Sequence, residues 1–305
     1  MIDGRHLLSG LIVPIVTGLD AESRPDATLS ARLLDAMADA GVTKLMVLGS
    51  NGEGPLIPTS MLRGYLEEMV QAWHDRVPLG AVVVNATAPA TLEALERGAL
   101  AVAAGADAVA VCAPFYFRHR DDEILEHFRR FAALEAPVVA YNIPRYVNDL
   151  TPAVIEQLPE LSHVIGVKDS SGDLETLARF IALKDARPDF GVSQGGETAL
   201  LAGLRMGADG IVPGTGNIAP SLAVRLLDAL AVGDDAAAER AQEVTTLLTG
   251  MHRIRAGVPS VKAVLDQLGL LTPHVAPPLA PCTEAERSAL AEFIAPFRAE
   301  LIGGS

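Results

Sequence analysis

The sequence contains little cysteine and no long hydrophobic run. Its two cysteines, Cys112 and Cys282, provide neither a disulfide framework nor a zinc-binding spacing, and this scarcity favours a reducing, cytoplasmic location. No stretch of about 18 apolar residues is present, so the sequence predicts no transmembrane helix. The apolar segment 7–16 is interrupted by Gly10 and Pro14 and has no small-residue cleavage site, so we do not interpret it as a signal peptide.

Positive charge is also scarce. The 305 residues include 38 acidic and 24 basic side chains, which gives a formal net charge of −14. An acidic chain repels phosphate backbones and anionic lipid headgroups, so we expect no nucleic-acid partner and no membrane partner. Half of the residues are apolar, and a chain of this length buries enough surface to fold without disulfides or a structural metal.

Short apolar segments rich in β-branched residues alternate with amphipathic helical segments. Many of the short apolar segments are apolar at consecutive positions, which is typical of parallel strands buried on both faces. The predicted strands cover residues 10–17, 44–49, 79–85, 108–114, 137–144, 164–171, 191–196 and 210–214, and the predicted helices cover 29–40, 59–74, 91–104, 121–134, 152–158, 174–184, 197–206 and 219–231. Eight such units predict an α/β fold of the (β/α)8 TIM barrel type over residues 1–232.

The pattern becomes all-helical after residue 232, with predicted helices at 236–254, 259–268 and 283–301. We interpret residues 233–305 as a C-terminal helical layer packed on the barrel, because no linker-like stretch separates them from it. A doubly wound open sheet is the main competing fold, but no Gly-x-Gly-x-x-Gly motif follows the first predicted strand.

Lysine is the rarest charged residue, and its placement is informative. Of four lysines, Lys44 begins a strand, whereas Lys184 and Lys262 fall in predicted helices. Lys168 follows the apolar run 164–167, at the carboxyl end of a strand, where barrel enzymes carry their chemistry. Burial disfavours the charged form of an amine, and a neutral amine attacks carbonyl carbon to form a Schiff base. The alternative is a structural lysine that pairs with Asp169.

Two neighbouring segments add reactive groups at the same rim. Tyr141 ends the fifth predicted strand, and its hydroxyl could move protons beside the amine. Ser50 and Asn51 lie in the glycine-rich segment 49–54 after the second strand, whose N–H groups could bind a carboxylate. The structural alternatives are a core tyrosine and an ordinary βα turn.

These segments together carry a family resemblance. The chain has Gly-Ser-Asn-Gly-Glu at 49–53, Pro-Phe-Tyr at 114–116, Tyr-Asn-Ile-Pro at 141–144 and Gly-Val-Lys-Asp at 166–169. In this order the motifs resemble those of the dihydrodipicolinate synthase / N-acetylneuraminate lyase superfamily of class I, Schiff-base aldolases. The resemblance runs from about Leu7 to the final helices.

The resemblance implies a role for each matching residue. Lys168 would form the Schiff base with pyruvate or another 2-oxo acid, and Tyr141 would be the general acid/base. Ser50 would hydrogen-bond the tyrosine hydroxyl or the substrate carboxylate, with Asn51 and Gly52 completing the carboxylate-binding loop. The covalent lysine would replace any metal or other cofactor, so none is expected.

The resemblance also bears on the pocket and on assembly. Gly195 and Val212 would line the pocket. Tyr116 matches a tyrosine that family members often lend to the site of a neighbouring subunit, which implies a homo-oligomer, either a dimer or a tetramer. Arg145 could bind a distal carboxylate of the substrate, although an arginine in a surface loop could equally be solvated.

Departures from the family pattern bear on the substrate. Dihydrodipicolinate synthases usually have Thr-Thr where this chain has Ser50 and Asn51, and Arg145 directly follows Pro144 in a segment that is one residue shorter. We therefore expect an aldolase for 4-hydroxy-2-oxoglutarate or a 2-keto-3-deoxy sugar acid. The alternative is a 4-hydroxy-tetrahydrodipicolinate synthase, which condenses pyruvate with aspartate semialdehyde.

Three other classes of function remain open. Glycines at 195–196 and 214–217 could bind a phosphate, as in other barrels. A metal-dependent aldolase would need clustered ligands, and we interpret His119, His127 and His163 as surface residues because none pairs at ligand spacing. A non-catalytic 2-oxo-acid-binding protein would bind but not turn over its ligand.

Overall fold

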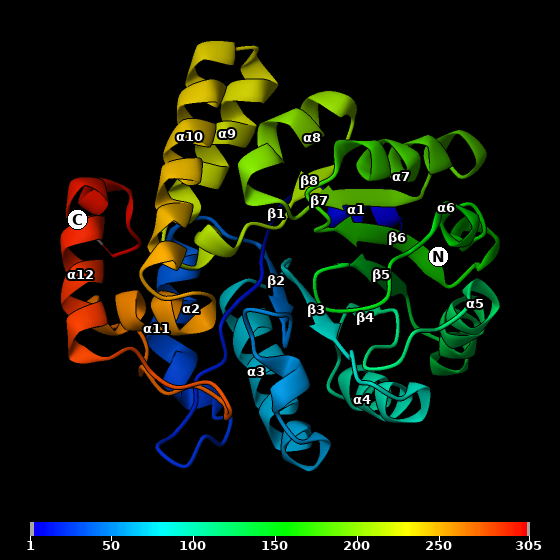
Figure 1. Ribbon diagram of the computed structural model, residues 1–305, viewed down its shortest axis with the longest axis horizontal. Helices are drawn as coiled ribbons and strands as arrows, with labels where there is room; N and C mark the ends of the chain where they lie inside the picture. The colour runs from blue at the N-terminus through cyan, green and yellow to red at the C-terminus, as the bar shows by residue number, and fades with distance from the viewer. Residues whose placement is uncertain (1–2, 304–305) are drawn as a thin grey trace.

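The computed structural model describes residues 3–303, and its centre is a closed barrel of eight parallel strands (Figure 1). Each strand pairs with the next along the chain, and β8 pairs with β1. This confirms the predicted (β/α)8 TIM barrel. The strands are β1 (Gly10–Val13), β2 (Lys44–Val47), β3 (Ala81–Asn85), β4 (Ala108–Cys112), β5 (Val138–Asn142), β6 (Val164–Asp169), β7 (Gly191–Gln194) and β8 (Gly210–Ile211).

The helices that follow the strands form an outer ring around the barrel (Figure 1). They are α2 (Ala31–Asp39), α3 (Leu62–Arg76), α4 (Thr91–Ala103), α5 (Asp121–Arg130), α6 (Pro152–Ile155), α7 (Leu174–Ala186), α8 (Leu200–Met206) and α9 (Pro220–Val232). Five of the predicted helices in this ring overlap 3₁₀ turns, which span Ala27–Ser30, Thr59–Met61, Phe131–Leu134, Leu158–Glu160 and Glu197–Ala199. A short helix that the sequence pattern did not predict, α1 (Gly4–Leu8), contacts β6 and β7.

Among residues 3–303, two of three apolar clusters follow from the alternation of side chains along each strand, and the third groups Cys112, Tyr141, Ile143 and Val147. The larger core fills the space between the barrel and the helices, and a smaller core fills the barrel interior. The interior core contains Leu7 and Leu8 of α1, together with Ile12, Met46, Val83, Ala108, Ala110, Val139, Ile165 and Val212. Helix α1 therefore supplies apolar side chains to the barrel interior from the N-terminal segment.

An irregularity in β6 changes which of its side chains face inward. The pairing register of β5 and β6 shifts between Val138 and Val139, as in a β-bulge. Ile165 belongs to the interior core, whereas Val164 and Val167 belong to the outer one. Strict alternation from Ile165 would turn Val167 inward. Because of the shift, Lys168 faces inward instead.

The chain beyond α9 is helical, as expected. It contains α10 (Asp235–Leu248), α11 (Val258–Gln267) and α12 (Glu284–Ile294), with 3₁₀ turns at Thr249–Arg253 and Ala295–Glu300. Helix α10 packs along α9, and α11 packs against α12 (Figure 1). The boundary at residue 232 stays a prediction, because α9 and α10 pack together across it. Within residues 3–303, no helix is both long and apolar enough to cross a membrane.

Candidate active site

Four side chains from neighbouring strands lie in register around the inner face of the barrel. Cys112 of β4 is paired with Tyr141 of β5, Tyr141 with Lys168 of β6, and Lys168 with Ser193 of β7. All four residues are buried, with exposed fractions of 4% or less. They lie toward the carboxyl ends of their strands, the end at which TIM barrels carry their active sites.

The amine of Lys168 lies among apolar and aromatic groups. Its Nζ is 4.1 Å from the centroid of the Tyr141 ring and 3.6 Å from the sulfur of Met46. The carboxylate of Asp169 instead accepts hydrogen bonds from Asn142 Nδ2, at 2.8 Å, and from Ser171. The alternative in which Lys168 pairs with Asp169 is therefore wrong. Among residues 3–303 the amine has no carboxylate partner, so it is available to react with a carbonyl group.

The hydroxyl groups of Tyr141 and Ser50 are close to each other. The distance between Tyr141 Oη and Ser50 Oγ is 3.3 Å, and either atom could donate the hydrogen bond. Ser50 comes three residues after the end of β2, in a loop whose carbonyl at Gly52 accepts a 2.6 Å hydrogen bond from Thr17 Oγ1. The two hydroxyls could pass a proton between the loop and the interior of the barrel.

The same loop offers backbone donors. In the described part of the chain, the N–H groups of Ser50 and Asn51 make no intramolecular hydrogen bond. Asn51 lies beside the loop after β8, since a Cβ placed on Gly214 would be 3.0 Å from Asn51 Nδ2 and 3.3 Å from Glu197 Oε2. Free N–H groups next to an amide side chain are suited to binding a carboxylate.

Gly195 lies close to the lysine, and Val212 belongs to the interior core. A Cβ placed on Gly195 would be 3.1 Å from Lys168 Cε, and it would collide with Ser170 Oγ. A side chain at this position would therefore displace the lysine or the neighbouring serine. Val212 belongs to the interior core together with Met46, whose sulfur contacts the amine.

Tyr116 and Arg145 lie apart from the buried row. Both line a recess of about 220 Å³ formed by residues 115–118 and 144–148. Tyr116 is 86% exposed and has a φ of +81°, in a region that a bulky residue adopts rarely and at a cost of about 1–3 kcal/mol. Arg145 is exposed, and its guanidinium lies 5.4 Å from the centroid of the Tyr146 ring.

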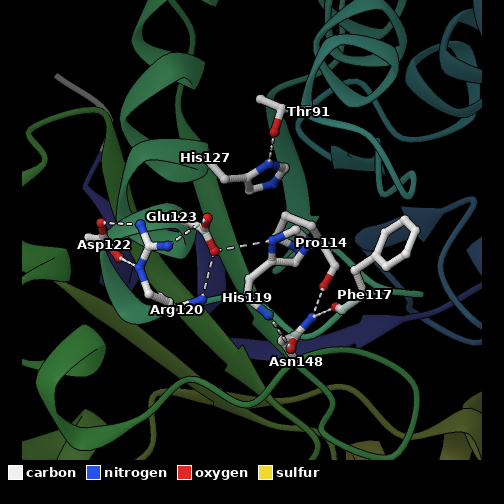
Figure 2. Close-up of polar contacts among 9 residues, drawn as sticks. All are labelled: Thr91, Pro114, Phe117, His119, Arg120, Asp122, Glu123, His127 and Asn148. Atoms are coloured by element: carbon white, nitrogen blue, oxygen red, sulfur yellow. Dashed lines mark hydrogen bonds and ion pairs between the residues drawn. The ribbon is translucent and has the colours of Figure 1, made fainter.

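The loop that presents Tyr116 is tied down by Asn148, as Figure 2 shows. The Asn148 amide donates to the carbonyls of Pro114, at 2.6 Å, and Phe117, at 2.7 Å. Its side-chain oxygen accepts a hydrogen bond from the N–H of His119 at 3.2 Å. These three contacts join the loops after β4 and β5, so that they can hold the strained conformation of Tyr116.

His127 is buried, so its interpretation as a surface residue was wrong. It is 2% exposed, and its Nε2 donates to the carbonyl of Cys112 at 3.1 Å. Its Nδ1 accepts a hydrogen bond from Thr91 at 2.9 Å, as Figure 2 shows. Burial lowers the pKa of His127 to about 4. His127 lies on the buried face of α5, which packs against the barrel. Its two ring nitrogens therefore meet Cys112 of β4 and Thr91 of α4.

The other open functions gain little from the geometry. His163 is half-buried and contacts the carbonyl of Phe128, and among residues 3–303 no three His, Cys, Asp or Glu side chains are grouped so that they could hold a metal ion. In the glycine-rich loop after β8, the N–H of Thr215 already donates to Glu197 at 2.6 Å. A carboxylate at that place repels a phosphate.

The remaining lysines lie away from the row. Lys44 donates to the carbonyl of His6 at 2.6 Å, near α1. Lys184 forms an ion pair with Asp209 at 2.7 Å. Lys262 is fully buried against Glu53.

Sequence reasoning missed three buried polar residues, Ser193, Glu53 and Lys262. Two of these residues could have been noticed in the sequence, because each is a polar residue within an apolar segment. Ser193 interrupts a predicted strand, and Lys262 lies in the otherwise apolar run Val261–Leu265. Neither signal names the partner, which depends on the fold.

Known sequences resemble this chain over nearly its whole length. The model of the dihydrodipicolinate synthetase family matches residues 7–296. A 4-hydroxy-tetrahydrodipicolinate synthase from Hyphomonas neptunium is 33% identical over 286 residues, covering 92% of this chain and 95% of the relative. A putative 2-dehydro-3-deoxy-D-gluconate aldolase from Escherichia coli, YagE, is 30% identical over 292 residues, covering 93% of this chain and 95% of the relative.

Solved structures resemble it as well. YagE from E. coli in complex with pyruvate superposes with a TM-score of 0.90 at 29% identity, covering 96% of this chain and 99% of the other. A dihydrodipicolinate synthase from Bacteroides thetaiotaomicron superposes with a TM-score of 0.87 at 27% identity, covering 94% and 98%. These matches confirm the resemblance that the four motifs indicated.

The buried, neutral His127 makes stability depend on pH. Its pKa is lower in the folded chain than the ordinary 6.5, so its contribution is fully present above pH 6.5 and is lost as the pH falls toward 4. The loss is on the order of 3 kcal/mol, from the difference between the two pKa values. We expect His127→Gln to flatten the decline in thermal midpoint between pH 7 and pH 4. His6→Gln, at an exposed position, is the control and should leave the slope unchanged; equal slopes for wild type and His127→Gln would contradict the assignment.

Proposed function

This chain belongs to the dihydrodipicolinate synthetase family and is an aldolase or lyase, and we propose that it is a class I, pyruvate-dependent enzyme whose Schiff base forms at Lys168. The observation that carries the proposal is the position of the amine, buried on the inner face of β6 with the Tyr141 ring at 4.1 Å. The hydroxyl of Ser50, 3.3 Å from that of Tyr141, supports a proton path to the same place.

Each proposed step has a residue to perform it. The amine of Lys168 attacks the carbonyl carbon of the 2-oxo acid, and Tyr141 donates a proton to the carbinolamine oxygen, which leaves as water. The resulting iminium ion joins Lys168 Nζ to C2 of the substrate by a C=N bond. The substrate carboxylate accepts hydrogen bonds from the N–H groups of Ser50 and Asn51, which fixes the 2-oxo carbon beside the amine.

Cleavage then follows from the electron demand of the iminium ion. The phenolate of Tyr141 takes the proton of the 4-hydroxyl group, the bond between C3 and C4 breaks, and an aldehyde leaves. The electron pair of that bond forms an enamine with the iminium carbon. Protonation at C3 and addition of water release pyruvate and restore the amine of Lys168. The iminium ion accepts the electron pair of the C3–C4 bond, so these steps require no metal ion.

The rim of the site supports a polyol substrate. Glu197 lies beside Gly214 and Asn51, with one carboxylate oxygen bonded to the N–H of Thr215 at 2.6 Å. A carboxylate accepts hydrogen bonds from sugar hydroxyls and repels a distal carboxylate. Arg145, the candidate for binding such a carboxylate, is exposed in the recess with Tyr116. We therefore place 2-keto-3-deoxy sugar acids first, 4-hydroxy-2-oxoglutarate second, and aspartate semialdehyde with pyruvate as the alternative.

The proposal includes a homo-oligomer, a dimer or a tetramer. Tyr116, Phe117 and Tyr146 are 86%, 69% and 57% exposed around one recess, together with Arg145. Exposed aromatic residues with arginine are typical of protein–protein interfaces. A second copy covering this recess would shield them and bring Tyr116 toward the partner's site.

A reducing, cytoplasmic location is also part of the proposal, supported by the two free cysteines.

Covalent trapping tests the Schiff base directly. Borohydride reduction in the presence of pyruvate should attach a three-carbon label to Lys168, because the other lysines are either distant or held in ion pairs. Peptide mass spectrometry locates the label, and Lys168→Arg is the matched unlabelled control. A label on another lysine, or no label on the wild type, would contradict the proposal.

Removing one hydroxyl separates proton transfer from Schiff-base formation. Tyr141→Phe keeps the ring beside Lys168 but cannot move a proton, so we expect kcat to fall by about 10²–10⁴ while slow trapping with pyruvate persists. Ser50→Ala, which removes the second hydroxyl only, should have a smaller effect in the same direction. A Tyr141→Phe enzyme with wild-type kcat would show that another group moves the proton.

A substrate panel tests the choice of partner. Wild type should cleave a 2-keto-3-deoxy sugar acid faster than 4-hydroxy-2-oxoglutarate, and it should condense pyruvate with aspartate semialdehyde poorly. Glu197→Gln should lower kcat/KM for the sugar acid about tenfold, roughly 1.4 kcal/mol, through loss of one charged hydrogen-bond acceptor. Arg145→Ala should lower kcat/KM only for a substrate with a distal carboxylate, by about thirtyfold, or roughly 2 kcal/mol, and should leave the sugar acid unaffected. Faster condensation with aspartate semialdehyde than cleavage of either acid would favour the alternative function.

A further inference from the structure

A buried ion pair joins the loop after β2 to the C-terminal helices. Glu53 Oε1 lies 2.5 Å from Lys262 Nζ of α11, and both side chains are 0% exposed. The second carboxylate oxygen of Glu53 accepts a 2.5 Å hydrogen bond from the N–H of Ala276. Lys262 also donates to the carbonyl of His274 at 2.7 Å. The pair thus fastens one loop of the barrel to two segments of the C-terminal layer.

Glu53 is connected to Ser50 by a backbone hydrogen bond. The N–H of Glu53 donates to the carbonyl of Ser50 at 3.3 Å, so the two residues close a single tight turn. Glu53 has a φ of +56°, a conformation that a residue with a side chain adopts rarely and retains when its surroundings hold it there. A shift of Glu53 therefore moves the backbone of Ser50, whose hydroxyl lies 3.3 Å from that of Tyr141.

Other anchors of this loop come from the barrel and its helices. Asn85 Nδ2 donates to the carbonyl of Leu48 at 2.9 Å, and Arg97 Nη1 donates to the carbonyl of Gly54 at 2.8 Å. Both hold the loop near its ends. Within the turn itself, Thr17 Oγ1 donates to the carbonyl of Gly52, and Lys262 reaches Glu53 from the C-terminal layer.

Stability alone is a weak reason for such a pair. The cost of moving two charges out of water can exceed their attraction, and replacement by apolar residues of similar size is often neutral. An ion pair with additional hydrogen bonds defines both the direction and the distance between its partners. It can therefore hold the loop in one position more precisely than apolar packing can.

We propose that Glu53 and Lys262 are positioning residues that hold Ser50 in place for Tyr141, so that proton transfer in the barrel depends on the C-terminal layer. Neither residue touches the reacting atoms. The inference rests on the proposed function of Lys168 and Tyr141, and it goes beyond that function by assigning residues 233–305 a part in the chemistry.

The test compares turnover per working site rather than total activity. Glu53→Gln keeps the shape and the acceptor for Ala276, and the remaining lysine can lose its proton because burial lowers the pKa of Lys262. The double variant Glu53→Gln/Lys262→Met removes both charges. It replaces the single variant in the same measurement if the single variant does not fold. Lys184→Met breaks the ion pair with Asp209, which does not contact this loop, and is the matched control.

For each variant, borohydride trapping with pyruvate counts the competent Lys168 sites, and kcat is divided by that count. We expect Glu53→Gln and the double variant to be trapped, yet to lose about tenfold in kcat per trapped site, no more than Ser50→Ala loses, with a smaller change in KM. Lys184→Met should lower the thermal midpoint and leave kcat per trapped site unchanged.

A second comparison shows whether the pair acts through Ser50. In a Ser50→Ala background, Glu53→Gln should cause little further loss of kcat, because the hydroxyl to be positioned is already absent. Wild-type kcat per trapped site in Glu53→Gln, or full additivity with Ser50→Ala, would overturn the inference. Failure of the wild type to be labelled at Lys168 would instead overturn the proposed function, so the two failures are distinguishable.

Discussion

The inward direction of Lys168 is the constraint on which the site depends. Strict alternation along β6 from Ile165 would place Val167 and Asp169 inside the barrel and Lys168 outside. The register shift between β5 and β6 reverses this order. A Cβ at Gly166 would collide with the carbonyl of Gly191, so glycine permits the close approach of β6 and β7 at the irregularity. The amine thus reaches the interior, and the carboxylate remains among the polar groups of Asn142 and Ser171 outside it.

The surroundings of the amine are fixed by contacts between successive βα units. Tyr141 stands beside Lys168 because β5 and β6 pair in register, and Ser50 reaches Tyr141 across the top of the barrel from the loop after β2. His127 holds the end of β4 through the carbonyl of Cys112, and Asn148 joins the loops after β4 and β5. His127 and Asn148 are buried side chains that satisfy backbone carbonyls after strand ends, where regular pairing stops.

The lysines at the two ends of the barrel have different surroundings. At the end near α1, Lys44 and Lys184 are occupied by carbonyl oxygens and by Asp209, which ties together the starts of strands. At the other end, Lys168 is the amine without such partners within the described chain, and the Glu53–Lys262 pair supports the loop around it. This arrangement is consistent with a barrel in which one rim contributes stability and the other reactivity.

The sequence by itself determined the barrel and indicated the candidate reactive groups. Eight apolar segments alternating with helical ones predicted the fold, because both periodicities are local properties of the chain. The scarcity of lysine singled out Lys168, and the ordered motifs around Tyr141 and Ser50 indicated the family. The tertiary structure alone decided that Lys168 rather than Asp169 faces inward, that His127 is buried, that Arg145 lies beside Tyr116, and that Glu53 meets Lys262. These facts depend on a register shift and on contacts between residues far apart in the chain, and a local pattern of polarity does not specify which distant residue will be the partner.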